Sequence, residues 1–240
     1  MKVTKFFSAF PISLILITTT ALSSDQAWFR MLGFSEDGEY AAWEMGGIQD
    51  GSGFQWIELE ILDTGSSAQV ERYRYVWDEL VDELPDEEDV ASIDLEILDI
   101  CREYGIQPGS YESPLVLHPM TDLGVSGDSV AFCLESYTPN YNSGEILMIL
   151  SLLTAEIEQG YPEWFPPPAM PVLHVVEDGA TALFFSGKLV QERFSLDFSY
   201  SIAAVYRNPV VCNSLLVVLH SIRPGFEGPD GRFRVVSGGI

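Results

Sequence analysis

The sequence predicts a mainly β protein, with antiparallel sheets arranged as an irregular propeller or a sandwich and one amphipathic helix over residues 86–104. Three observations support this prediction. Polar and apolar residues alternate over residues 56–62, several short apolar runs are bounded by Gly/Asp turns, and one segment repeats its apolar residues at helical spacing. With 47% hydrophobic residues among 240, the chain has enough apolar material for a core, which excludes a disordered acidic chain.

The first 23 residues have the composition of a secretory signal peptide. Lys2 and Lys5 precede an apolar stretch, and Ala21 and Ser23 are small residues at the spacing that a signal peptidase needs. The apolar stretch is shorter than the roughly 20 residues of a spanning helix, which argues against a retained anchor. We therefore expect cleavage, export to the periplasm or the extracellular space, and no stable membrane span afterwards.

The first predicted strands follow a Gly/Asp turn at residues 33–38. Residues 40–44 form a short apolar strand, and a Gly-rich link connects it to the alternating strand at 56–62. Residues 63–65, Asp-Thr-Gly, close this second strand with the chemistry of a turn. The pattern is typical of half-buried antiparallel strands.

An acidic segment at residues 78–89 interrupts the β pattern and leads into the predicted helix. It has eight acids in twelve residues, and Pro85 with the acids after it suits the first turn of a helix. The helix is expected to end before Gly105 and to cover one face or one open edge of a sheet. Its apolar stripe consists of Val90, Ile93, Ile97, Cys101 and Tyr104.

Beyond the helix, further short apolar runs are separated by turn residues. The strands predicted there are 130–134, 181–185, 194–206, 210–222 and 233–236. The run at 146–153 is either a strand or a buried helical segment, because a short all-apolar run does not reveal its period. Residues 223–232 are predicted to be the connection between the last two strands.

The length predicts a single secreted β-rich domain over residues 24–240. Residues 161–171 contain three consecutive prolines and form a rigid connection, which is a candidate sub-boundary within that domain. The cysteines at 101, 133 and 212 are far apart and have apolar neighbours, so we expect buried free thiols. One disulfide plus one free thiol is the alternative.

The formal net charge of −24 excludes two classes of partner. Nucleic acids and anionic lipid surfaces both need a basic face, and this chain has 12 basic residues against 36 acids. The expected partner is therefore an envelope protein or a small ligand.

The densest mixed-charge segment is the candidate ligand-binding site. Arg223 and Arg232 can present guanidinium groups to an anionic ligand, with Phe226 as an apolar contact. Glu227 and Asp230 lie between them in the sequence. The alternative is structural, because Arg–acid pairs within the segment would hold the shape of a strand connection.

Asp50 and Ser52 are the candidate metal ligands, for calcium only. They supply a carboxylate and a hydroxyl in a Gly-rich loop, but an EF-hand needs further acidic ligands at fixed offsets. The alternative to a calcium site is a tight connection between two strands. No other cofactor is expected.

The sequence contains no hydrolase elbow, phosphate loop or paired zinc-binding histidines, and His118, His174 and His220 are isolated. No catalytic residue is assigned.

Two parts of the chain resemble a known family. The stretches GFSEDGEY at 33–40, GIQDGSGF at 47–54 and RPGFEGPD at 223–230, followed by Arg232 and Phe233, resemble bacterial predicted secreted proteins with domain of unknown function 2259. The resemblance implies export from a bacterial cell and a single domain. That family has no established activity, so no catalytic residue follows from it.

The N-terminal stretch also resembles a blade of the TolB-type propellers, which mostly serve as scaffolds for protein contacts. Together these observations predict an exported, soluble, non-catalytic binding or interaction module of the bacterial cell envelope. The alternative is an envelope hydrolase with a site built from sequence-distant acidic and His residues.

Overall fold

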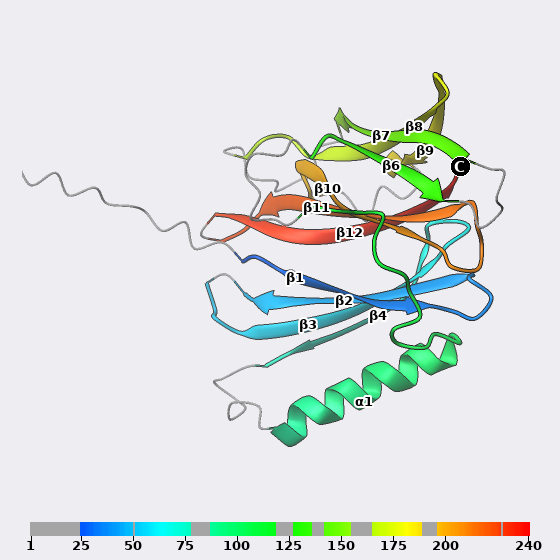
Figure 1. The fold of residues 1–240 in the computed structure, drawn as a ribbon. Helices are drawn as coiled ribbons and strands as arrows, with labels where there is room; N and C mark the ends of the chain where they lie inside the picture. Colours follow the sequence, from blue (N-terminus) through cyan, green and yellow to red (C-terminus); the bar gives the residue numbers. More distant parts are fainter. Residues whose placement is uncertain are drawn as a thin grey trace, which may run out of the picture.

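The protein folds into three stacked antiparallel sheets and a helix (Figure 1). The computed structural model describes residues 25–49, 51–77, 87–118, 127–135, 142–154, 165–188, 196–226 and 228–240. Within this part of the chain the predicted class, mainly β with one amphipathic helix, is confirmed. The sheets pack face to face, so of the two predicted arrangements the structure has the sandwich.

The first sheet has the strand order β1-β2-β3-β4. Its strands are β1 (Trp28–Phe34), β2 (Tyr40–Ile48), β3 (Gln55–Asp63) and β4 (Gln69–Val76). The predictions for β2 and β3 are confirmed, whereas β1 and β4 were not predicted. A register shift between Met31 and Gly33 disturbs the alternation in β1, and β4 is too polar to show an apolar run.

Helix α1 (Glu87–Glu103) covers the outer face of the first sheet, as the amphipathic pattern predicted (Figure 1). Ile93, Ile97 and Cys101 are buried against apolar side chains of β1, β2 and β3. Gly105 then takes a φ of +67°, a left-handed conformation that terminates helices and favours glycine. The helix thus ends where the sequence places its stop signal.

The middle sheet is apolar on both faces. Its order is β12-β11-β10-β5, from β5 (Val116–Leu117), β10 (Ser199–Arg207), β11 (Ser214–Pro224) and β12 (Pro229–Gly239). Leu216 and Val218 pack toward the first sheet, while Val217 and Leu219 pack toward the third. Burial on both faces explains why β11 appears in the sequence as a continuous apolar run without alternation.

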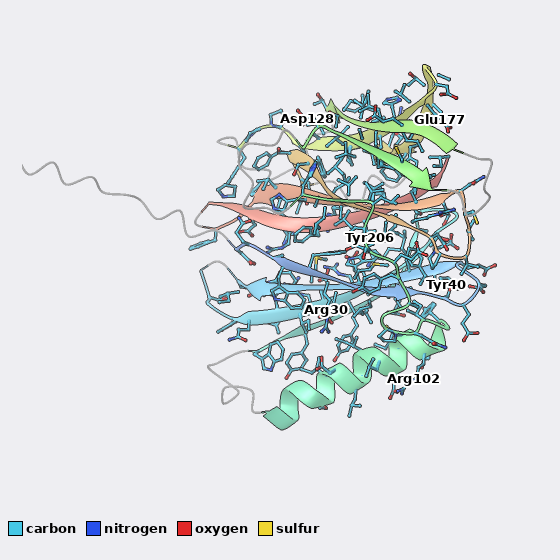
Figure 2. The ribbon with its side chains drawn as sticks, in the orientation of Figure 1. Arg30, Tyr40, Arg102, Asp128, Glu177 and Tyr206 are labelled. Atoms are coloured by element: carbon cyan, nitrogen blue, oxygen red, sulfur yellow. The ribbon has the colours of Figure 1, made fainter. Side chains whose placement is uncertain are left out.

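The third sheet packs on the other side of the middle sheet, in the order β6-β7-β8-β9. Its strands are β6 (Ser129–Glu135), β7 (Asn142–Thr154), β8 (Ala169–Glu177) and β9 (Ala180–Ser186). The run at 146–153, which the sequence left open, is therefore a strand. Side chains fill the space between the layers (Figure 2). In the predicted rigid connection, residues 161–164 lie outside the described part and 169–171 already belong to β8.

Two sequence-based expectations are wrong. Residues 223–232 are not a connection throughout, because β11 extends to Pro224, β12 begins at Pro229, and the two strands pair from Pro224 opposite Pro229 onward. Glycine and proline suggested a loop, yet the hairpin tolerates both at its end. All three cysteines are free, but Cys133 and Cys212 are exposed and Cys101 alone is buried.

Cys133 lies on the outer face of the third sheet, opposite Glu145, and Cys212 lies in the turn before β11. Apolar neighbours in the sequence therefore did not indicate burial at these two positions. No helix among the described residues is both long and apolar enough to cross a membrane.

Candidate functional site

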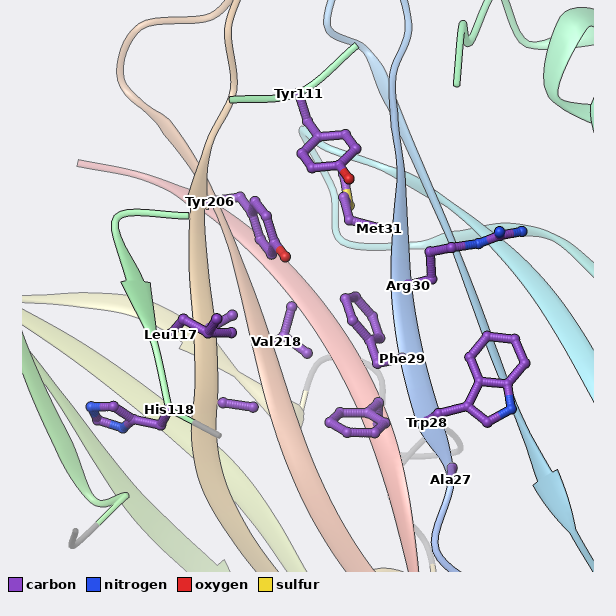
Figure 3. Close-up of a pocket in the computed structure, with 13 residues that line it drawn as sticks. Ala27, Trp28, Phe29, Arg30, Met31, Tyr111, Leu117, His118, Tyr206 and Val218 are labelled. Carbon is purple, nitrogen blue, oxygen red and sulfur yellow. The ribbon is translucent and has the colours of Figure 1, made fainter. Parts of the chain in front are cut away.

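A pocket of about 470 Å³ lies between β1 of the first sheet and strands β5 and β10 of the middle sheet (Figure 3). The segment that follows α1 runs from the helix up to β5 along this side of the molecule (Figure 1). It contributes Tyr111 and Leu117 to the lining. The pocket thus joins residues from parts of the chain that are far apart in the sequence.

The walls of the pocket are mostly apolar. The rings of Phe29 and Phe233 pack with their centroids 5.3 Å apart, one from β1 and the other from β12. Met31 and Val218 add aliphatic surface beside them. Such a lining favours an apolar ligand body, because burying apolar surface contributes about 25 cal/mol per Å².

Two tyrosine hydroxyls point into this apolar space (Figure 3). The rings of Tyr111 and Tyr206 meet edge to face, with centroids 6.0 Å apart. Tyr206 is 7% exposed, and no described residue forms a hydrogen bond with either hydroxyl. Burial, and secondarily Tyr111, raises the pKa of Tyr206, so its phenol is neutral at pH 7 and can donate or accept.

Arg30, the charged residue at the rim of the pocket, pairs with Glu44 outside it. The Arg30 side chain points away from the pocket (Figure 3), and its Nε lies 2.5 Å from Oε1 of Glu44. Glu44 is buried, and burial raises the pKa of its carboxyl despite the opposing effect of Arg30. The two tyrosine hydroxyls and the imidazole of His118 are therefore polar groups of the lining that no ion pair engages among the described residues.

The predicted site at the end of β11 and β12 is mostly a structural ion-pair cluster. Arg232 is buried, with Nη2 2.5 Å from Asp25 Oδ2 and 3.4 Å from Asp230 Oδ2, and its guanidinium lies 4.8 Å from the centroid of the Trp56 ring. The indole of Trp56 also donates to Asp25. The structural alternative therefore holds for Arg232 and Asp230.

The other members of that predicted site are placed differently. Arg223 is half-buried and forms no ion pair with a described residue, and Phe226 is 85% exposed at the tip of the hairpin. Glu227 lies outside the described residues. Asp25 was missed in the sequence, since nothing marks this single acid as the partner of an arginine 207 positions away.

Of the two candidate calcium ligands, Asp50 lies outside the described residues, and the Ser52 hydroxyl forms hydrogen bonds within its own turn. The Ser52 hydroxyl donates to Gln49 Oε1 at 3.1 Å and accepts from the Phe54 amide at 3.3 Å. The described residues contain no group of three or more His, Cys, Asp or Glu side chains able to hold a metal ion. The calcium site stays a prediction.

The histidines have mainly apolar surroundings. His174 lies on the outer face of the third sheet between Ile149 and Leu183, and the ring of His220 packs 5.5 Å from that of Phe233. His118 lines the pocket with a buried Nδ1 that has no hydrogen-bond partner in the described part of the chain. Within the described residues, no hydrogen bond or ion pair connects these histidines to a carboxylate.

The sequence did not reveal the residues of the pocket, since Phe29, Tyr111 and Tyr206 belong to no motif. Nothing in the sequence distinguishes Tyr206, because tyrosine is common in strands. Comparisons of the chain with protein-family models, curated proteins and solved structures found no match.

Proposed function

We propose that the protein is an exported, non-catalytic binding protein of the cell envelope whose pocket between β1 and β10 holds a small neutral ligand. The ligand has an apolar body and one hydroxyl or carbonyl group. The observation that carries this proposal is the pair of hydroxyls of Tyr111 and Tyr206 at one side of an apolar pocket, for which the described residues offer no hydrogen-bond partner. The export itself rests on the leader at residues 1–23.

The size and polarity of the pocket support this class of ligand. A volume of about 470 Å³ falls within the range of small-molecule sites, which combine apolar walls with a few placed polar groups. Displacing water from the pocket leaves the two phenols in need of a hydrogen-bond partner. A ligand oxygen satisfies that need.

The charge distribution argues for a neutral ligand. The protein has a net charge of −24, and the Arg30 side chain at the rim pairs with Glu44 instead of facing the pocket. An anion would enter this pocket without a compensating cation, at the cost of its desolvation.

The experiment measures binding of N-phenyl-1-naphthylamine, a neutral apolar fluorophore, to the purified chain. We expect saturable binding that Ala203→Phe weakens at least tenfold by filling the pocket. Ala182→Phe, at an exposed position of β9, is the matched control and keeps the affinity of the unchanged protein. Equal binding by both variants, with melting curves showing that both are folded, would overturn the assignment of the pocket.

Competition tests the polar end of the pocket. 2-Naphthol should displace the fluorophore about three- to tenfold better than naphthalene, because one net hydrogen bond contributes roughly 0.5–1.5 kcal/mol. In a double variant with Tyr111→Phe and Tyr206→Phe this preference should disappear while naphthalene binds as before. An unchanged preference would assign the hydroxyl contact to other groups.

A further inference from the structure

Arg223 is the described arginine for which no carboxylate lies within ion-pair distance among the described residues. The other described arginines each have an interaction partner. The chain has 36 acids and 12 basic residues, so acids are not scarce. Asp197 and Asp230 attract Arg223 from beyond ion-pair distance, so this half-buried guanidinium has no direct partner among the described residues, which needs an explanation.

The register of the last hairpin places three arginines on one face. Arg223 lies opposite Asp230, and Arg232 lies opposite Ser221, two positions along the same face. Diagonal neighbours of this kind are about 7–8 Å apart. Arg234 follows on the same face, so three guanidinium groups approach one another at this end of the middle sheet.

Two of these three arginines are neutralised. Arg232 pairs with Asp25 and Asp230, and Arg234 donates to both oxygens of the buried Asp197 at 2.8 and 3.4 Å. Asp230 and Asp197 are therefore engaged, and no described residue accepts a hydrogen bond from the guanidinium of Arg223.

The surroundings make the positive charge of Arg223 costly. Burial, then repulsion from Arg232 and Arg234, lowers the pKa of Arg223 to about 10, so the group remains protonated at pH 7. A guanidinium that has lost part of its hydration gains most from a bidentate anion, whose two oxygens match its paired donors.

Phe226 supplies an apolar surface three residues further along, at the tip of the hairpin. Its ring is 85% exposed, yet it lies against the loop after β2, where a Cβ built on Gly51 would come within 2.8 Å of the ring. One side of the ring thus lies near this loop, while most of the residue faces solvent. An exposed, positioned aromatic ring is suited to contact with a ligand.

We infer that Arg223 and Phe226 form a second binding site, for an organic anion with a carboxylate on an aromatic or apolar body. Arg223 holds the carboxylate through two hydrogen bonds, and Phe226 contacts the body. This site lies apart from the pocket, because neither Arg223 nor Phe226 is among the residues that line it. The inference is therefore independent of the proposed function of the pocket.

Calorimetric titration with benzoate tests this inference on the purified chain. It is done at about 0.15 M salt, where the Debye length of about 8 Å screens the net negative charge of the protein. We expect saturable binding that Arg223→Gln weakens at least tenfold and that Arg223→Lys, which keeps the charge but not the fork of donors, weakens less. Arg102→Gln, at an exposed helix position, is the matched control and changes nothing.

Further variants identify where benzoate binds. Phe226→Ala should weaken benzoate binding about threefold to tenfold and leave acetate unaffected, since acetate has no ring to contact. Tyr206→Phe should leave benzoate binding unchanged. A loss of benzoate binding in Tyr206→Phe but not in Arg223→Gln would place the anion in the pocket and overturn the inference.

Thermal melting distinguishes a loss of benzoate binding from a loss of folding in these variants. Removing an unpaired, partly buried charge should leave the melting temperature of Arg223→Gln equal to or above that of the unchanged protein, whereas Arg232→Gln breaks a buried pair and lowers it. If Arg223→Gln melts as the unchanged protein does and binds benzoate equally well, or if the unchanged protein shows no saturable binding, the inference is wrong.

Discussion

The first and third sheets are both four-stranded antiparallel meanders on the outside of the stack, yet their outer faces differ. Helix α1 covers the outer face of the first sheet and buries Leu59 and Ile61 (Figure 1). No described residue outside the third sheet forms a comparable cluster on its outer face. Two sheets of the same topology therefore contribute unequally to the core.

The outer face of the third sheet has two rows of uncharged side chains. The strand register places Ala131, Leu147, Val176 and Thr181 in one row and Ser129, Ile149, His174 and Leu183 in the next. Leu183 is 59% exposed, so this face is open to solvent. The comparison shows that the position of an apolar residue in a strand determines which face of the sheet its side chain occupies. Whether the side chain is buried depends on whether another element covers that face.

Thiol reactivity gives the largest expected contrast between the two sheets. Burial raises the pKa of Cys101, beneath the helix, to about 11, whereas Cys133 is exposed on the third sheet. At pH 8 a thiol of that pKa is about one-thousandth thiolate, and the thiolate is the reactive form. In a Cys212→Ser background, a disulfide-exchange reagent should label Cys133 at least about a hundredfold faster than Cys101, since an ordinary thiol of pKa about 8.5 is about one-quarter thiolate at pH 8. Similar rates for both thiols would show that the helix does not protect Cys101.

Paired substitutions in the third sheet should separate its two faces. Phe132→Ala opens a cavity against the middle sheet and should lower the free energy of unfolding by about 3–5 kcal/mol. Leu183→Ala on the outer face should change it by less than about 0.5 kcal/mol. Urea denaturation measures both. A large loss in Leu183→Ala would mean that the outer face is covered in solution.

The helix offers the same comparison on one element. Ile97 is 3% exposed beneath the helix and Leu95 is 60% exposed on its solvent side. Ile97→Ala should therefore cost about 2–4 kcal/mol of unfolding free energy, and Leu95→Ala, the matched control, less than about 0.5 kcal/mol. Equal effects in urea denaturation would contradict the docking of α1.

The smallest expected effect concerns Glu44, which the helix-covered face buries. Because burial raises the pKa of Glu44 above its ordinary value of 4.5, its contribution to stability is complete below pH 4.5 and is lost as the pH rises through the folded-state pKa. The stability of Glu44→Gln relative to the unchanged protein should therefore rise between pH 4 and pH 7. A constant difference over this range would contradict the raised pKa.

The part of the fold that sequence patterns predicted is the part with a clear local period. The alternation over 56–62 identified β3, and the three- and four-residue spacing identified α1 to within a residue or two. Strand β4 escaped prediction because its side chains are mostly polar, and the connection at 223–232 was misplaced because its glycines and prolines resemble a loop. The binding role of Arg223 and Phe226 stays a prediction, and the pocket was not predicted.

The sequence by itself determined the β class, the single helix with its buried stripe and stop at Gly105, and the excess of acids. These depend on periodicity, turn chemistry and composition, which act between near neighbours along the chain. Only the tertiary structure decided that the last three strands lie between the other two sheets, that Arg232 meets Asp25 and that Tyr206 faces a pocket. The physical reason is that each of these depends on packing between faces whose residues are far apart in the sequence, and no local period encodes which faces meet.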